Sequence, residues 1–367
     1  MKDYSMKHYS MNPYSINFIA LNYNLKNTNL AKQCISKYCF AILVLFLSFI
    51  TISQSYAQDP IDQQDQIDQA ALSFFTTLPK VMPGSDKDTQ EQVSLGKKLY
   101  FETSLSINNV QSCNSCHNIV NGAPGVDHLK VSIGTLGTLG TRNAPTTWNA
   151  GFHVAQFWDG RANTLEEQAK FPILDPNEMA MPSEKEVINR LLNKGYLEQF
   201  AKAFPNHTSP INLDTISVAL ASFQRTLITS DRFDEYLAGN TNAINRDEKE
   251  GLAVFIKRGC VACHNGPVLG GKLFMKMGLV HPYPNKIDKG MAKVTGNPAD
   301  SYFFKVPSLR NILNTAPYFH DGAAATIEQA IEDTGWHQLG IKISNKDVRA
   351  IKVFFNTLDN QTKLIEK

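Results

Sequence analysis

The chain has 367 residues, of which 43% are hydrophobic and 19% charged, with 22 Gly, 17 Pro and 6 Cys. This is the composition of a globular protein, so it excludes disordered, collagen-like, coiled-coil and disulfide-rich miniprotein classes. Removal of the first 57 residues would leave 31 Lys and Arg against 33 Asp and Glu. A nucleic-acid partner is therefore not expected, because no basic excess is left to meet a phosphate backbone.

The first 57 residues have the pattern of a secretory signal peptide. Five lysines and one acid precede or flank an apolar run at 39–52, which is short for a membrane span of about 20 residues. Ser55-Tyr56-Ala57 then offers a small-x-small cleavage site. We expect export to the periplasm and no membrane association after cleavage. The alternative is that the run stays as an uncleaved N-terminal anchor.

The rest of the chain is expected to be mainly helical, with few and short strands. In chain order, helical periodicity and flanking signals predict helices at 90–100, 184–204, 214–227, 248–258 and 346–358. The stretch 122–147 is rich in Gly, Thr, Asn and Pro and is expected to be loop. The segment 231–245 is expected to be a polar bridge.

The four cysteines that remain after the leader fall in two Cys-x-x-Cys-His motifs. The motifs are Cys113, Cys116, His117 and Cys260, Cys263, His264. This pattern attaches a c-type haem, because two thiols one helical turn apart meet its two vinyl groups and the adjacent His ligates the iron. Two disulfides or a zinc site are the alternatives, but the following His does not suit a disulfide framework, and zinc needs four ligands close together. We predict two covalent haem c groups.

The two motifs lie 147 residues apart and predict two haem-carrying domains. The expected domains are 58–228, which holds the first motif, and 229–367, which holds the second. The fold class is thus mainly α, with two cytochrome c-like domains that each carry one covalent haem. The last helix can pack back on the first domain.

Five runs outside the motifs have a dense functional character. They are Asn143-Ala-Pro-Thr146, Ala155-Gln-Phe-Trp-Asp-Gly-Arg161, Glu178-Met179, Pro307-Ser-Leu-Arg-Asn311 and Thr315-Ala-Pro-Tyr-Phe-His320. In these runs and in the motifs the sequence resembles the bacterial di-haem cytochrome c peroxidase family, over nearly all of the mature chain. The resemblance implies a peroxidatic haem at the first motif and an electron-accepting haem at the second. It further implies reduction of hydrogen peroxide to water, a small c-type cytochrome or copper protein as electron donor, and a homodimer.

The resemblance also implies roles for three further side chains. Glu178 matches the family's acid–base glutamate, which would take a proton from the peroxide and return it to the departing oxygen. Gln168 matches a distal glutamine that could orient the peroxide, and Trp158 matches a tryptophan that relays electrons between the haems. On residue type alone, the alternatives are a solvated acid, a helix-surface amide and a packing Trp.

A calcium ion between the domains is a further implication of the resemblance. In the family an Asn side chain and the backbone carbonyls of Thr and Pro bind this ion, and Asn143, Thr315 and Pro317 fall at those positions. Oxygen ligands suit such a hard cation. The alternative is a capping Asn and an ordinary Thr-Ala-Pro turn.

One position near the first motif departs from the family pattern. In many members a loop His blocks the resting peroxidatic iron, but Thr135 stands at that position here. Thr is not a haem ligand, so the first haem is expected to be open at rest. His128 and His153 are the nearby alternatives for a blocking ligand.

A second departure concerns the electron-accepting haem. The usual Met ligand is replaced by Thr334, and His337 follows about one helical turn later. We favour His337 as the sixth ligand, which would lower the potential relative to Met. Met275 and Met277 are the alternatives.

Three other functions stay open on the sequence. One is a structural or partner-binding protein that merely contains haem, which would leave two covalent redox centres without a use. The other two involve electron transfer. The first is a di-haem enzyme that oxidises a protein residue, as the enzymes that mature tryptophan-derived cofactors do. Thr135 and Thr334 favour it, but the Tyr ligand of those enzymes has no confident equivalent here. The second is a non-catalytic electron-transfer protein with both irons six-coordinate, against which Glu178 argues.

Overall fold

The computed structural model describes residues 60–362, so the predicted signal peptide at 1–57 lies outside the described residues. The α-helices are α2 (Pro60–Phe74), α3 (Gln90–Tyr100), α4 (Cys113–Cys116), α5 (Leu165–Leu174), α6 (Glu184–Asn193), α7 (Leu197–Ala203), α8 (Leu213–Gln224), α9 (Arg232–Leu237), α10 (Arg246–Lys257), α11 (Ala292–Thr295), α12 (Ile327–Thr334) and α13 (Asn345–Phe355). Within 60–362 there are two strands, β1 (Phe274–Lys276) and β2 (Phe303–Lys305), which pair antiparallel with Met275 opposite Phe304. The prediction of a mainly helical chain with few strands is confirmed.

Most predicted helices are present, and the differences have local causes. The helix expected at 184–204 is two helices, α6 and α7, separated at Gly195, whose φ of 78° is a left-handed conformation that suits glycine. The predicted polar bridge contains α9, whose N-cap is Asp231; the Asp231 side chain accepts a hydrogen bond from Asp234 N. In the described part of the chain, no helix is both long enough and apolar enough to cross a membrane.

Residues 61–362 belong to one compact unit, and this unit contains two large hydrophobic cores. The first core joins α3, α5, α6, α7 and α8, and Leu99, Phe200 and Ile216 are fully buried in it. The second core joins α9, α10, α12 and α13 around Phe233 and Phe354. Helix α2 precedes the first core in sequence, yet its side chains pack in the second core.

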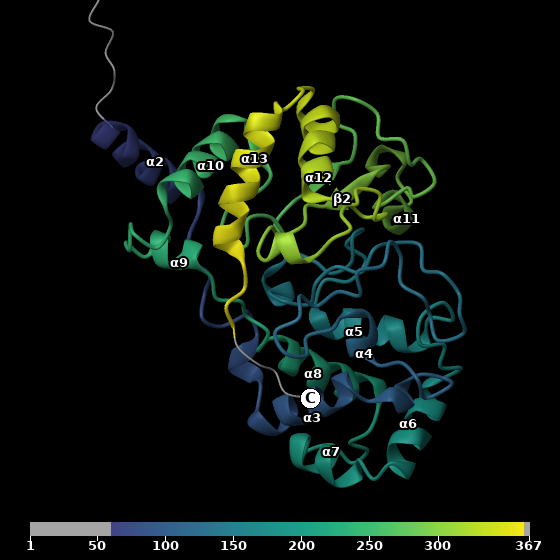
Figure 1. Cartoon of the computed structure of the whole chain (residues 1–367). Coiled ribbons are helices and arrows are strands. Elements are labelled where there is room, and N and C mark those ends of the chain that lie inside the picture. Colours follow the sequence, from purple (N-terminus) through teal and green to yellow (C-terminus); the bar gives the residue numbers. More distant parts are fainter. Residues whose placement is uncertain (1–59, 363–367) are drawn as a thin grey trace, which may run out of the picture. The chain divides into compact units, whose positions relative to one another are not determined.

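The same kind of helix crossing holds each core together (Figure 1). In the first core α3 packs on α8, and a Cβ added at Gly96 would lie only 1.8 Å from Ala219 O. In the second core α10 packs on α13, and a Cβ at Gly251 would lie 2.1 Å from Ala350 O. Glycine is therefore required at both crossings, where the two backbones touch. The last helix, α13, packs on α10 and α12 in the second core.

Candidate active site

A cavity of about 740 Å³ is lined by both Cys-x-x-Cys-His motifs. The first motif forms the short helix α4, and His117 N donates to Cys113 O at 2.9 Å. The second motif follows α10 after Gly259, whose φ of 85° ends that helix, and His264 N donates to Cys260 O at 3.0 Å. Each motif is thus one compact turn that presents two thiols and an imidazole to the same space.

No disulfide joins the four cysteines of the motifs. Burial raises the pKa of Cys113 to about 12 and the pKa values of Cys116 and Cys260 to about 11, and it also raises the pKa of Cys263. Among residues 60–362, no three His, Cys, Asp or Glu side chains gather in a way that could hold a metal ion. The disulfide and zinc alternatives therefore find no support.

The histidines of the cavity fit a haem group. His264 Nδ1 lies 3.0 Å from Leu269 O, which orients the ring and leaves Nε2 available as an iron ligand. Burial lowers the pKa of His117 and of His264, so both rings are neutral and able to ligate. Three histidines that line this cavity each have one buried ring nitrogen without a hydrogen-bond partner: His117 Nδ1, His153 Nε2 and His320 Nε2.

Glu178 lies beside the first motif, on the turn after α5, and lines the cavity. Its negative charge helps to raise the pKa values of Cys113 and Cys116, which places the carboxyl group near both thiols. Burial raises the pKa of Glu178 itself, Asp175 adds to this effect, and Arg161 opposes it. Gln168, in α5, lines the same cavity. A half-buried carboxyl group with a raised pKa is suited to proton transfer.

The loop that includes Thr135 is bound to the backbone beside Glu178. Thr135 N donates to Glu178 O at 2.7 Å, and Asn108 Nδ2 donates to Thr135 O at 2.6 Å. The Thr135 hydroxyl bonds to the Asn108 side chain and does not line the cavity. A Cβ at Gly134 would lie 2.0 Å from Asn177 O, so only glycine permits this close approach.

The two alternatives for a blocking ligand lie in different surroundings. His128 is exposed, and its Nδ1 lies 3.1 Å from Ala316 O, away from the cavity lining. His153 lines the cavity, and its Nδ1 lies 3.3 Å from Lys305 Nζ. Burial lowers the pKa of Lys305 to about 7 and the pKa of His153 well below its usual range.

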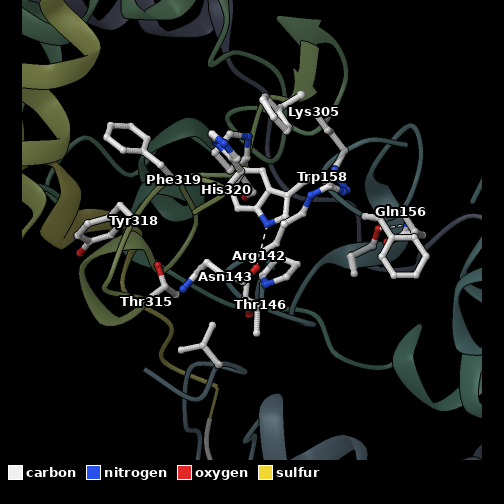
Figure 2. Close-up of a pocket in the computed structure, with 18 of the residues that line it drawn as sticks. Arg142, Asn143, Thr146, Gln156, Trp158, Lys305, Thr315, Tyr318, Phe319 and His320 are labelled. Atoms are coloured by element: carbon white, nitrogen blue, oxygen red, sulfur yellow. Dashed lines mark hydrogen bonds between the residues drawn. The ribbon is translucent and has the colours of Figure 1, made fainter. Parts of the chain in front are cut away.

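Trp158 links two residues of the cavity wall, Asn143 near the first motif and Lys305 after the second (Figure 2). Its Nε1 donates to Asn143 O at 2.9 Å, and its carbonyl accepts from Lys305 N, in β2, at 2.7 Å. Asn143 N in turn donates to His320 O at 2.9 Å. The indole is therefore held between a residue near the first motif and a strand that follows the second.

The three residues expected at the calcium site all line this cavity. Asn143 and Thr315 are on the wall shown in Figure 2, and Pro317 is on the same segment as Thr315. Asn143 Nδ2 donates to Leu129 O at 2.9 Å, which fixes the side-chain amide. Asn143 thus lines the same cavity as Thr315 and Pro317, which come much later in the chain.

His337 is placed differently from the other predicted residues. It is buried in the π-helical turn Gly335–Leu339, where Nδ1 lies 3.0 Å from His281 O and the ring packs against Tyr283. It is not among the residues that line the cavity, whereas Met275, Met277 and Thr334 are. The structure therefore gives no support to His337 as a ligand, whereas both methionines line the cavity.

Two buried ion-pair groups were not anticipated from the sequence. Arg142 bonds to Asp288 at 2.6 and 2.9 Å and pairs with Asp159 at 2.7 Å, and Arg142 and Asp159 line the cavity. Although burial opposes it, Arg142 lowers the pKa of Asp288 to about 2. Arg310 binds Asp231 at 2.6 and 2.7 Å, fully buried. Asp159 and Arg310 lie in the runs Ala155–Arg161 and Pro307–Asn311, which were the sequence signal for these groups. The acidic partners Asp288 and Asp231 could not be identified without the fold.

A helical chain with two c-type haem motifs on one cavity is a di-haem cytochrome. A model of the family described as di-haem cytochrome c peroxidase matches residues 90–242. The chain is 45% identical over 275 residues to cytochrome c551 peroxidase of Nitrosomonas europaea, covering 74% of this chain and 80% of the relative. It is 38% identical over 331 residues to cytochrome c551 peroxidase of Pseudomonas aeruginosa, covering 88% and 92%.

Among solved structures, the chain is similar to a MauG-like protein associated with microbial copper homeostasis. The TM-score is 0.67 at 30% identity, covering 77% of this chain and 94% of that protein. The chain belongs to the di-haem cytochrome c peroxidase family, and its cofactors are two haem c groups.

Proposed function

We propose that this protein is a cytochrome c peroxidase, which reduces one hydrogen peroxide to two water molecules with two electrons and two protons. The observation that carries the proposal is that one cavity is lined by both haem motifs, with Glu178 beside the first motif and Trp158 held between the two halves. A non-catalytic electron-transfer protein has no need of an acid–base group at this place. The electrons come one at a time from a small redox carrier.

The residues of the two motifs would hold the cofactors. Cys113, Cys116 and His117 would hold the peroxidatic haem, and the matching residues of the second motif, Cys260, Cys263 and His264, the electron-accepting haem. When bound, the haem groups supply the iron that receives peroxide and a second centre that stores an electron. For the sixth position at the second haem we favour a methionine at 275 or 277 over His337, because these two line the cavity.

Glu178 moves the protons in this proposal. Its carboxylate accepts a proton from peroxide in the cavity and donates it to the oxygen that leaves as water. The raised pKa of Glu178 favours this exchange, since an acid–base group works best when its pKa is close to the working pH. Gln168 orients peroxide through its amide, and Trp158 lies on the electron path between the two halves of the wall.

Several parts of the proposal concern the whole protein. The two cores support domains at 58–228 and 229–367, except that α2 packs with the second. Calcium bound by Asn143, Thr315 and Pro317, export to the periplasm with removal of 1–57, and a homodimer complete the proposal.

The oxidation of a protein residue is the competing enzymatic function. The related enzymes ligate the second haem with a Tyr. Two tyrosines line the cavity, but Tyr100 OH donates to His117 O at 2.7 Å and Tyr318 OH to Ile312 O at 3.1 Å. Both hydroxyls are already engaged with backbone carbonyls, which favours the peroxidase.

Turnover of the fully oxidised holoprotein with peroxide and a reduced c-type carrier tests the proposal. We expect turnover without a lag and without reductive pre-treatment, because Thr135 and His128 both face away from the cavity. Turnover that starts only after pre-reduction would reveal a blocking ligand, with His153 the first to be replaced. Absence of turnover under both conditions would overturn the peroxidase in favour of a non-catalytic electron-transfer protein.

A further inference from the structure

The segment 272–294, which follows the second motif in the chain, forms a lysine-rich surface. Its five lysines are all exposed: Lys272, Lys276, Lys286, Lys289 and Lys293. The segment holds one acid, Asp288, which is buried and bound to Arg142, and Lys293 Nζ lies 3.7 Å from its Oδ1. Acids also lie close by: Asp300 accepts a hydrogen bond from Thr295, Asp321 accepts one from Tyr283, and the charge of Asp333 also acts on Tyr283.

Three of these lysines converge on one phenol. Lys286 Nζ and Lys289 Nζ lie 4.7 and 4.8 Å from the centre of the Tyr302 ring, and Lys289 Nζ donates to Tyr302 OH at 2.8 Å. The hydrogen bond from Lys289, with the charges of Lys286 and Lys276, lowers the pKa of Tyr302. The positive charge of these three lysines is therefore concentrated around Tyr302.

Apolar side chains accompany the lysines. Ile287 is 88% exposed, Leu279 and Val280 are each 52% exposed, and Trp336 is 41% exposed. Large apolar groups at such exposure, with charges around them, are typical of an interaction surface.

This surface is joined directly to the wall of the cavity at the second motif. Gln338 lines the cavity, and its Oε1 accepts from Gly278 N at 2.8 Å and Leu279 N at 3.1 Å, while Nε2 donates to Lys276 O at 3.1 Å. Lys293 also lines the cavity. A partner on this surface would therefore lie close to the second haem.

The remainder of the protein has the opposite charge. Segment 272–294 carries five basic residues and one acid, and the other residues of 58–367 carry 26 basic and 32 acidic residues. Such an asymmetry orients an approaching charged protein, so that an acidic partner meets this surface first and a basic partner is repelled from it.

We propose that this lysine surface (Lys276, Lys286, Lys289 and Lys293 with Leu279, Val280, Ile287 and Trp336) docks a small acidic electron carrier. The proposal rests on the proposed function and deepens it, because it defines the charge of the donor. Electrons then enter beside Gln338 and Met275, at the part of the cavity that contains the second motif.

The test compares a small acidic c-type cytochrome with a small basic one as reduced donors for the holoprotein. We expect the KM for the acidic donor to be lower, and to rise at least about tenfold between about 20 and about 300 mM NaCl, with kcat unchanged. The double variant Lys276→Glu/Lys286→Glu should raise this KM by about tenfold or more at low salt. The matched control Lys185→Glu/Lys194→Glu makes the same charge change at exposed positions near α6 and should leave the KM within about twofold.

A small uncharged reductant such as hydroquinone separates the two proposals. If all variants turn over peroxide with hydroquinone but the two double variants have equal KM for the acidic donor, the docking surface is wrong and the peroxidase stands. If no form turns over peroxide with either reductant, the proposed function itself fails. Binding to anionic phospholipid vesicles that depends on Lys276 and Lys286, with the donor KM unchanged, would assign the lysines to a membrane surface instead.

Discussion

Glu178 combines the properties that an acid–base group needs, and its position depends on two neighbours. The turn after α5 holds it through the bond from Glu178 N to Asp175 O at 3.0 Å, and Thr135 N caps its carbonyl at 2.7 Å. Both bonds involve the backbone, so the carboxyl group is free to act in the cavity. Its raised pKa comes from burial and from Asp175.

Replacement of this carboxyl group should remove most of the activity. We expect Glu178→Gln to lower peroxide turnover by about 10² to 10⁴-fold, since the amide cannot accept a proton. In the native protein, turnover should fall as the pH falls through the raised pKa of Glu178, and the variant should lack this limb. Steady-state kcat/KM for peroxide against pH measures both effects.

A stability measurement controls for misfolding of this variant. Because the folded-state pKa of Glu178 is raised, its charge costs stability above that pKa, and the cost vanishes as the pH falls to the unfolded-state value. Glu178→Gln should therefore not lower Tm at neutral pH. Glu91→Gln, at an exposed position of α3, is the matched change and should keep full turnover. Full turnover by Glu178→Gln would disprove the assignment.

At the scale of elements, each core depends on a crossing of two helices through one glycine. In each core one helix of the pair precedes a haem motif and the other follows it in the chain. These helices are α3 and α8 for the motif at 113–117, and α10 and α13 for the motif at 260–264. The close approach at Gly96 and Gly251 therefore sets the distance between the helices that enclose each motif. This repetition supports one cytochrome c-like unit per motif.

Addition of a single methyl group at these crossings should destabilise the fold. In an isolated helix, Ala is favoured over Gly by about 1 kcal/mol. At Gly96 or Gly251 the new Cβ would meet backbone carbonyl oxygen, so we expect each Ala variant to be less stable by about 1–3 kcal/mol. Thermal unfolding of the holoprotein, with Ser94→Ala on the exposed side of α3 as control, measures this. An unchanged or higher Tm for Gly96→Ala would show that α3 and α8 can move apart freely.

At the scale of the whole molecule, buried polar links join the two halves of the chain. Arg142 binds Asp288, Trp158 accepts a bond from Lys305, and Asn143 accepts one from Trp158 and donates to His320. Asn143 thus takes part in the cross-links and is also a proposed calcium ligand. Loss of the ion should therefore disturb the electron path as well as the metal site.

Removal of calcium should lower activity without unfolding the protein. We expect EGTA to reduce peroxide turnover with a protein donor by about 10- to 100-fold, and Ca²⁺, but not Mg²⁺, to restore it, because the larger ion suits carbonyl ligands. Asn143→Ala should behave like the EGTA-treated protein and should not respond to Ca²⁺, while Asn193→Ala, at an exposed position, should match the native protein. Equal turnover with and without EGTA would remove calcium from the proposal.

The sequence by itself determined the cofactor, because Cys-x-x-Cys-His is a local motif whose reactive atoms lie within one turn, and it predicted the helices with strong periodicity. It also predicted roles for Glu178, Trp158 and Asn143 through resemblance to a family. Only the tertiary structure decided that α2 joins the second core, that His337 lies outside the cavity while Met275 and Met277 line it, and that Arg142 pairs with Asp288. The lysine surface likewise required the structure, since exposure and convergence on Tyr302 depend on how distant segments pack. Such long-range contacts are set by packing and charge pairing between segments, which local sequence patterns do not encode.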